Sequence, residues 1–98
     1  MDTLEVINHL KELPGQRLSD IWEKRTFECC REKKGGAVAA DGGSVEQTVT
    51  IDIYDSGLEG EFRYRCVATG DNGLQTTGNP GSTIKITLMT VHWDKLDR

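Results

Sequence analysis

Hydrophobic and polar residues alternate along residues 45–54 in the pattern typical of a β-strand with one buried face. The β-branched residues Val49, Ile51 and Ile53 fall on one side of such a strand, and Thr50 and Asp52 fall on the other. We therefore predict that the first set packs into a hydrophobic core and that the second set faces water.

A second alternating run, residues 61–69, follows a segment rich in turn-forming residues at positions 55–60. Its predicted inward residues are Phe62, Tyr64, Cys66 and Ala68. An antiparallel hairpin is the shortest connection between the two runs.

The register of this hairpin is restricted, because a slip of one residue would turn a whole hydrophobic set towards water. Pairing Ile53 with Phe62 and Ile51 with Tyr64 keeps both sets on one face. A slip of two residues keeps the faces as well, so the pattern leaves that alternative open.

The next turn, at residues 71–73, has the sequence Asp-Asn-Gly. A two-residue type I′ turn would point Leu74 outward, whereas a three-residue loop with Gly73 in the left-handed region would point it inward. We favour the three-residue loop, because Leu74 is the only large hydrophobic residue of the arm that follows. The third strand is predicted to end at residues 78–81, where Gly-Asn-Pro-Gly interrupts any ladder.

Two helices are predicted before the sheet. In residues 2–13 hydrophobic residues recur at helical spacing, and Asp2 or Thr3 can cap the free amides. Residues 19–34 are the second candidate, with Ser19 as the cap, Trp22 on the inward stripe and glycines after the end. A strand that begins at residues 26–29 is the alternative for this segment.

Residues 82–96 favour a helix with two hydrophobic stripes on opposite sides. A fourth strand is the alternative, because Thr, Ile and Val are frequent here. The stripe of Met89, Trp93 and Leu96 would be exposed in a monomer, and monomers rarely tolerate such a patch. We therefore predict a protein interface at these three residues, with Trp93 at or near the contact of a homodimer.

This order of elements predicts an α+β fold with two N-terminal helices, a three-stranded antiparallel meander and a C-terminal helix packed on one sheet face. The 98 residues are expected to form a single domain. Only 36% of the residues are hydrophobic, so the core is small, and a dimer would bury more of the hydrophobic surface.

Charge is distributed unevenly along the chain. Residues 35–62 hold six acidic side chains and no basic one, so an acidic sheet face with Glu46 and Asp52 is a candidate surface for a protein partner. A basic cluster precedes this block and consists of Lys24, Arg25, Arg31, Lys33 and Lys34. Glutamates are interleaved with the cluster, which favours a salt-bridged surface over a contact with nucleic acid.

The sequence contains no recognised motif of a catalytic, cofactor-binding or metal site. Its three cysteines include the adjacent pair Cys29 and Cys30 and show no Cys-x-x-Cys spacing, so neither a disulfide framework nor a zinc site is predicted. No hydrophobic run reaches the roughly 20 residues of a membrane span. We expect a cytoplasmic protein that is not an enzyme and that holds no cofactor or metal.

These observations predict a small intracellular interaction or regulatory protein that binds another protein. The alternative is a nucleic-acid-binding module that uses the basic cluster of residues 24–34. A continuous basic face in the folded chain would favour this alternative, and scattered basic residues would disfavour it.

Overall fold

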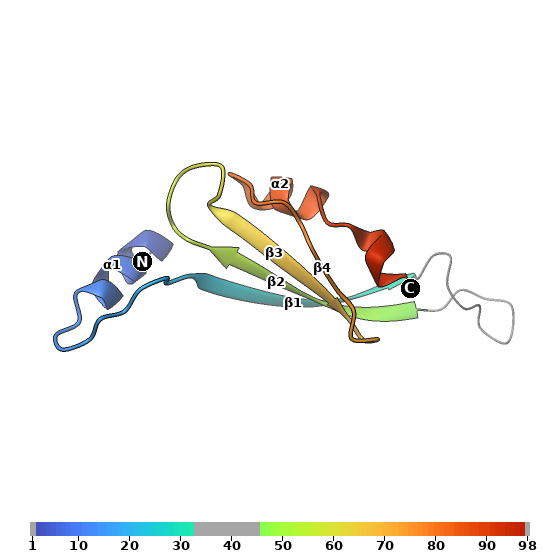
Figure 1. The fold of residues 1–98 in the computed structure, drawn as a ribbon, viewed down its shortest axis with the longest axis horizontal. Coiled ribbons are helices and arrows are strands. Elements are labelled where there is room, and N and C mark those ends of the chain that lie inside the picture. The colour runs from blue at the N-terminus through green and yellow to red at the C-terminus, as the bar shows by residue number, and fades with distance from the viewer. Residues whose placement is uncertain (1, 33–45, 98) are drawn as a thin grey trace, which may run out of the picture.

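A four-stranded antiparallel β-sheet forms the centre of the protein in a computed structural model that describes residues 2–32 and 46–97 (Figure 1). The strands lie in the order β1-β2-β3-β4, with the bounds β1 Glu23–Glu32, β2 Glu46–Asp55, β3 Tyr64–Gly70 and β4 Gln75–Thr77. The helices are α1 Thr3–Lys11 and α2 Ile84–Met89, and a 3₁₀ turn, η1, spans Trp93–Leu96. The predicted α+β class is confirmed, although there are four strands rather than three and one helix rather than two before the sheet.

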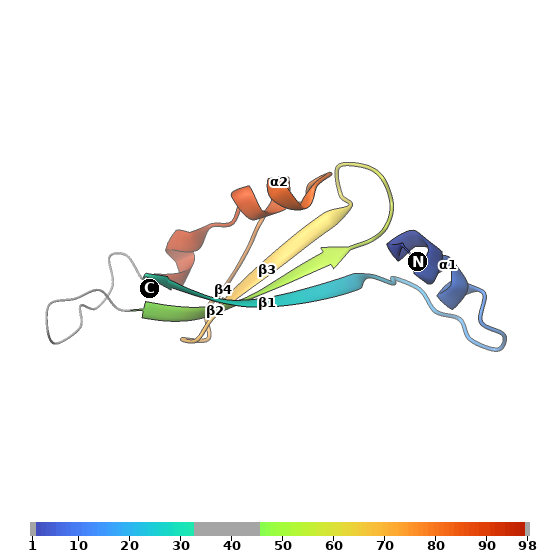
Figure 2. The same ribbon diagram turned by 180° about the vertical axis from the view of Figure 1, so that it is seen from behind.

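Helix α2 and η1 lie over one face of the sheet, which we call the inner face, whereas α1 lies beyond the end at which β1 begins (Figures 1 and 2). Within residues 2–32 and 46–97 no helix covers the other face, which we call the open face. The molecule measures 60 × 26 × 20 Å, and its radius of gyration of 17.2 Å exceeds the roughly 13 Å of a compact chain of this length. No helix in the described part of the chain is long and apolar enough to cross a membrane.

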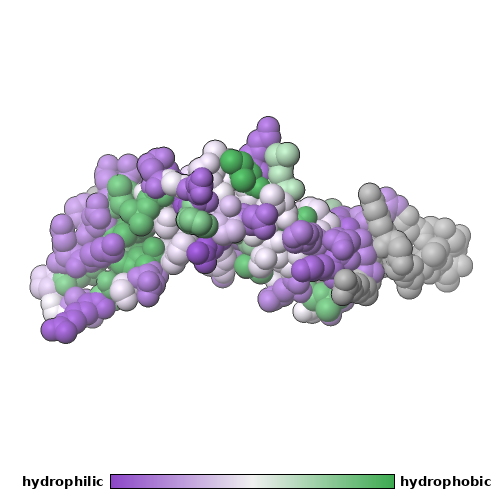
Figure 3. Space-filling view, turned by 45° about the horizontal axis from the view of Figure 1, so that its top comes forward, coloured by the Kyte–Doolittle hydropathy of each residue, from purple (hydrophilic) through white to green (hydrophobic). Residues whose placement is uncertain are grey.

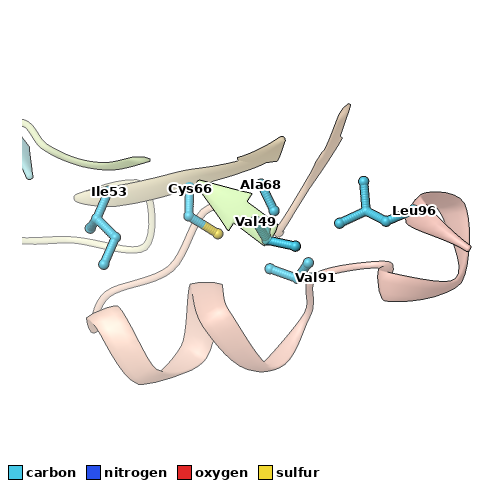
Figure 4. Packing of buried hydrophobic residues seen from close by; sticks show 6 residues of the cluster. All are labelled: Val49, Ile53, Cys66, Ala68, Val91 and Leu96. Atoms are coloured by element: carbon cyan, nitrogen blue, oxygen red, sulfur yellow. The ribbon is translucent and has the colours of Figure 1, made fainter. Parts of the chain in front are cut away.

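The hydrophobic core lies between the sheet and the C-terminal segment (Figure 4). Its buried residues are Val49, Ile53, Cys66, Ala68, Val91 and Leu96. The first four belong to β2 and β3, and the last two follow α2. Full burial of an aliphatic side chain contributes about 1.5–3 kcal/mol, so a core of this size leaves little margin for the loss of a member.

The alternation predicted for β2 is confirmed. Val49 is fully buried, whereas its neighbour Thr48 is exposed. The inner side of β2 also holds a polar residue, Gln47, which is buried and whose Nε2 donates a hydrogen bond to the carbonyl oxygen of Leu96 at 3.1 Å. Residue 45, which belongs to the predicted strand, lies outside the described residues.

The register between β2 and β3 differs from the predicted one by four residues. Ile53 lies opposite Cys66 and Ile51 lies opposite Ala68, so the inward faces of these two residues of β3 are confirmed. Phe62 lies in the connecting loop and is 66% exposed, so its predicted place in the sheet is wrong. The alternating pattern continues through residues 61–63, but these belong to a loop whose two ends are joined by an ion pair.

The turn between β3 and β4 is the three-residue loop that the sequence predicts. Gly73 has a φ angle of 84°, in the left-handed region, and the amide of Gly70 donates a hydrogen bond to the carbonyl oxygen of Leu74 at 2.8 Å. Thr76 is buried as a consequence, and Leu74 on the same side is 37% exposed at the end of the strand.

Residues 23–32 form a strand, so the helix predicted over residues 19–34 is wrong. The alternative of a strand is correct, although the strand begins at Glu23 and not at residues 26–29. Asp20, which stands next to the predicted helix cap, has a φ angle of 53° and begins no helix. Charged residues with good helix propensity fill this segment, but pairing with all ten residues of β2 outweighs that preference. All side chains of β1 except that of Arg31 are exposed, so no hydrophobic alternation marks the strand in the sequence.

Helix α1 confirms the predicted N-terminal helix and its cap. The amide of Glu5 donates a hydrogen bond to Oδ1 of Asp2 at 2.8 Å, which satisfies one of the free amides of the first turn. Ile7 is the buried side chain of this helix.

Residues 82–96 do not form one continuous helix or a fourth strand. Helix α2 ends at Met89, and the hydroxyl of Thr90 then donates to the carbonyl oxygen of Thr87 at 3.0 Å and accepts from the amide of Asn79 at 2.7 Å. The chain turns after Thr90, and Leu96 enters the core with none of its surface exposed. The prediction of two stripes along one helix is therefore wrong, because the break at Thr90 brings residues from both stripes to the sheet.

Helix α2 meets the sheet at very close range beside Gly78. A Cβ atom on Gly78 would collide with the carbonyl oxygen of Thr87 and would lie 2.8 Å from Sγ of Cys66. Thr87 is fully buried, and its hydroxyl donates a hydrogen bond to the same Sγ at 3.4 Å. Gly78 is thus required here because the helix backbone occupies the place of a side chain.

Gly78→Ala is expected to lower the free energy of unfolding by about 3 kcal/mol, because α2 must move away from the sheet to admit the methyl group. Denaturation in urea, followed by circular dichroism, measures this change. Ser82→Ala, at an exposed position near the same helix, is the control and should leave the unfolding midpoint unchanged. Equal midpoints for the two variants would contradict the close contact.

Candidate functional site

The side chains of the open face form rows that cross the sheet. In the first row Lys24 pairs with Tyr54 and Tyr54 pairs with Arg65. The second row consists of Thr26, Asp52, Val67 and Thr77, and the third of Glu28, Thr50, Thr69 and Gln75. One end of the open face is therefore aromatic and basic, and the other two rows are polar except for Val67.

Trp22 directly precedes β1 and lies next to the first row. The guanidinium carbon of Arg65 lies 5.5 Å from the centroid of the Trp22 ring, and Nζ of Lys24 lies 6.0 Å from the centroid of Tyr54. Both distances are within the range of cation–π attraction. Arg65 therefore helps to hold the Trp22 ring in position, while 37% of Trp22 stays exposed.

Two hollows in the surface share Trp22 and Arg65. The first has a volume of about 530 Å³, lies on the open face and is also lined by Tyr54, Val67 and Pro80. The faces of an indole and a phenol, an aliphatic side chain and a proline ring give this hollow a largely apolar lining. Arg65 supplies its charged group.

The second hollow has a volume of about 280 Å³ and lies towards the loop between β2 and β3, where Leu58 and Phe62 line it. These two side chains are 61% and 66% exposed. We call the combined surface the Trp22 site. It consists of Trp22, Tyr54, Leu58, Phe62, Arg65 and Val67.

The loop that carries Leu58 and Phe62 is closed by Asp55 and Arg63. Oδ1 of Asp55 accepts hydrogen bonds from Nε of Arg63 at 3.0 Å and from the amide of Gly57 at 2.8 Å. Burial alone would raise the pKa of the Asp55 carboxyl, but the hydrogen bonds from Arg63 and Gly57 and the charge of Arg63 together lower that pKa below its ordinary value. The ionised carboxylate therefore stabilises the closed loop.

Helix α1 supports the same loop from the other side. A Cβ atom on Gly57 would lie 3.3 Å from Cδ1 of Ile7 and from backbone atoms of Leu4, so the helix packs directly on the loop backbone. Leu4, Val6 and Leu13 remain about 40% exposed. Hydrophobic side chains accordingly gather at the α1 end of the molecule in the surface view (Figure 3).

Glu46 and Asp52, the predicted acidic contacts, both lie on the open face, as the alternation of β2 requires. Asp52 accepts a hydrogen bond from the hydroxyl of Thr26 at 2.7 Å and lies 3.9 Å from Nζ of Lys24. Its charge is thus partly neutralised by neighbouring side chains. A contact of Glu46 and Asp52 with a protein partner stays a prediction.

The three hydrophobic residues of the predicted C-terminal interface are separated in the structure. Leu96 is fully buried in the core, and Met89 is 74% exposed at the end of α2. Trp93 is partly buried, and the guanidinium carbon of Arg31 lies 5.6 Å from its ring centroid. Met89, Trp93 and Leu96 therefore do not form one exposed stripe, and dimerisation through Trp93 loses the argument on which it was based.

The predicted basic cluster is divided between the two faces of the sheet. Lys24 lies on the open face, whereas Arg25 and Arg31 lie on the inner face, where Arg31 forms an ion pair. Lys33 and Lys34 lie outside the described residues. Residues 24–32 therefore present no continuous basic face.

Cys29 and Cys30 point to opposite faces of β1, because adjacent side chains of a strand alternate. The two exposed thiols cannot bind one metal ion together while β1 keeps its pairing with β2. No group of three or more His, Cys, Asp and Glu residues in the described part of the chain is arranged to hold a metal ion.

The Trp22 site was not predicted from the sequence. Trp22 was assigned to the inward stripe of a helix, and Phe62 was assigned to the core face of a strand. Arg65 lies between the predicted inward residues Tyr64 and Cys66, so the alternation of this strand turns it to the open face. This was the one signal for the site in the sequence. What brings Trp22 beside Arg65 is the pairing of β1 with β2, which the exposed side chains of β1 do not reveal.

The chain matches no protein-family model, no curated protein and no solved structure in the comparisons made. The geometry and chemistry of its own surface are therefore the guide to its function.

Asp55→Asn is expected to lower the free energy of unfolding by about 1–3 kcal/mol near pH 7, because Arg63 loses its buried charged partner and keeps only the ion pair with the exposed Glu59. A carboxyl group whose pKa is lowered by folding stabilises the fold above its unfolded pKa of about 3.9, and this contribution is lost as the pH falls through the folded pKa. The difference between wild type and variant should thus be largest at neutral pH and should shrink below about pH 4. Thermal or urea unfolding across the pH range measures it, and a pH-independent difference would contradict the role of the charge.

Proposed function

We propose that the protein is a small, non-catalytic interaction or regulatory protein of the cytoplasm that binds another protein through the Trp22 site. The observation that carries this proposal is the clustering of Trp22, Tyr54, Phe62 and Arg65 around two adjoining hollows. Trp, Tyr and Arg are the residue types that most often contribute large binding energies in protein interfaces. Exposed free thiols at Cys29 and Cys30 suit a reducing compartment.

The construction of the site supports a partner that inserts side chains. The first hollow, of about 530 Å³, is large enough to accept several side chains of a protein partner, and its apolar lining would be removed from water on binding. The loop that carries Phe62 is closed by the ion pair of Asp55 and Arg63 and is supported by α1. A surface held in this way loses little conformational freedom on binding, which favours affinity.

The charges of the site favour a protein over nucleic acid. Glu59 and Glu61 line the second hollow together with Arg63 and Arg65, so acidic and basic groups alternate there. Lys24 lies near the carboxylate of Asp52 instead of standing alone. A phosphate backbone would meet repulsion from these acids, and the net charge of −4 adds to it. These charges therefore disfavour nucleic acid as the partner.

The combined variant Trp22→Ala with Phe62→Ala is expected to lose its protein partner while keeping its fold. Affinity capture from the native host with the full chain as bait should enrich one or a few proteins, and the variant should recover them at least about tenfold less, as expected when two central aromatic residues are truncated. Quantitative mass spectrometry measures the recovery, and circular dichroism confirms the fold of each bait.

Thr69→Ala is the matched control, because Thr69 lies on the same face in the third row, away from the hollows. This variant should recover the partner as well as the wild type does. Equal recovery by the Trp22 and Phe62 variant would refute the proposed site. Captured proteins that disappear after nuclease treatment would support the nucleic-acid alternative instead.

A further inference from the structure

Strand β1 forms one edge of the sheet and is ten residues long, whereas β4 at the other edge has three residues. No strand in the described part of the chain pairs with the outer side of β1. The strand contains neither proline nor glycine, and all but one of its side chains are exposed. An edge of this length offers a row of backbone groups on which another strand can pair.

The backbone groups that point to this free edge belong to the even-numbered residues of β1. The carbonyl oxygen of Thr48 on β2 and the amide of Ser56, which directly follows β2, bond towards the β3 side. Even-numbered residues of β2 therefore point to β3, and odd-numbered ones point to β1. Val49 pairs with Cys29, so odd-numbered residues of β1 point back to β2. The free donors and acceptors of the edge are therefore those of Lys24, Thr26, Glu28, Cys30 and Glu32.

We propose that β1 pairs with β1 of a second copy of the chain, antiparallel and about a twofold axis at Phe27. Residues whose numbers add up to 54 then lie opposite each other. The even-numbered residues 24–30 exchange about eight backbone hydrogen bonds across the axis. The two four-stranded sheets become one continuous sheet of eight strands. This inference does not depend on the Trp22 site, because it uses the edge of the sheet and not its open face.

The charges of β1 select this register. Glu23 lies opposite Arg31 of the partner, and this opposite-charge pair occurs twice about the axis. On the open face, Lys24 is the diagonal neighbour of Glu28 of the partner. Phe27, which is 45% exposed in one copy, lies directly against its counterpart on the inner face, where opposed aromatic side chains stabilise a strand pair.

The competing registers either bring like charges into opposition or shorten the ladder of hydrogen bonds. A twofold axis at Glu28 gives a ladder of equal length and sets Lys24 opposite Glu32 twice. It also places Glu28 against Glu28 and Arg25 against Arg31 twice, and like charges in direct opposition are destabilising. An axis at Thr26 or at Cys29 shortens the ladder, because part of β1 then passes the end of its partner. A shift by one residue would place inner-face side chains opposite open-face ones, which antiparallel pairing excludes.

The rest of the fold leaves room for this partner. Helix α2 packs on β3 and η1 contacts β4. The C-terminal segment meets β1 on the inner face at Arg31, through Trp93 and Asp97, and leaves the backbone groups of the free edge uncovered. Within the part of the chain that the structure describes, Asp97 and Gln47 accept hydrogen bonds from Nη1 of Arg31 at 2.7 and 3.0 Å. A guanidinium has five N–H donors, so this arginine can keep both bonds and still meet Glu23 of the partner.

The first test is the mass of the wild-type chain in solution. Sedimentation analysis from low to high micromolar concentration should give twice the 10.9 kDa of one chain. Glu28→Pro removes a donor that points to the free edge and should give a folded monomer, because an edge strand accepts proline where its amide faces water. A monomeric wild type at high micromolar concentration would overturn the proposal.

The second test fixes the register by cross-linking in a Cys29→Ser, Cys30→Ser background, in which buried Cys66 is the remaining thiol. In the proposed register Phe27 and its counterpart form a pair without hydrogen bonds, with Cα atoms about 4.5 Å apart, within the range that a disulfide can bridge. Phe27→Cys should thus form a covalent dimer under mild oxidation. Glu28→Cys should not, because its two copies lie about 8 Å apart. Cross-linking of Glu28→Cys alone would overturn the register.

Discussion

The packing of α2 on the sheet at Gly78 is the contact on which the inner layer depends. The helix has six residues, too few for independent stability, so it must gain its stability from tertiary contacts. Gly78 allows its backbone to touch the sheet, and Thr87 can then reach the thiol of Cys66. Because the helix packs so close to the sheet, the chain that follows it can bring Val91 and Leu96 into the core.

The predictable part of the fold is the part in which one face is buried. The alternation of Val49 with Thr48 and Thr50, the cap at Asp2 and the left-handed Gly73 each have a local physical cause and were predicted correctly. The strand β1 was missed because its side chains are exposed on both faces, so only its backbone pairing with β2 determines its structure. Alternation also cannot show where a strand ends, and for that reason Phe62 was assigned to a ladder instead of a loop.

The candidate site was harder to predict than the fold because it is assembled from three separate segments. Trp22 precedes one strand, Arg65 lies on another, and Leu58 belongs to a loop whose closure depends on Asp55. Taken alone, each of these residues fits an ordinary helix, strand or turn in the sequence and gives no sign of a site. The break in the chain at Thr90 had a comparable effect on the C-terminal residues, because it moved Leu96 from a predicted surface into the core.

A sheet covered on one face also affects how the protein responds to denaturants and heat. All side chains of β1 except that of Arg31 stay exposed to water in the folded chain. Unfolding therefore uncovers less new surface than in a compact domain of equal length. The slope of stability against urea and the heat capacity change of unfolding both scale with that surface. The stability curve of an isolated chain is consequently shallow, and its transitions extend over a broad range of temperature and denaturant.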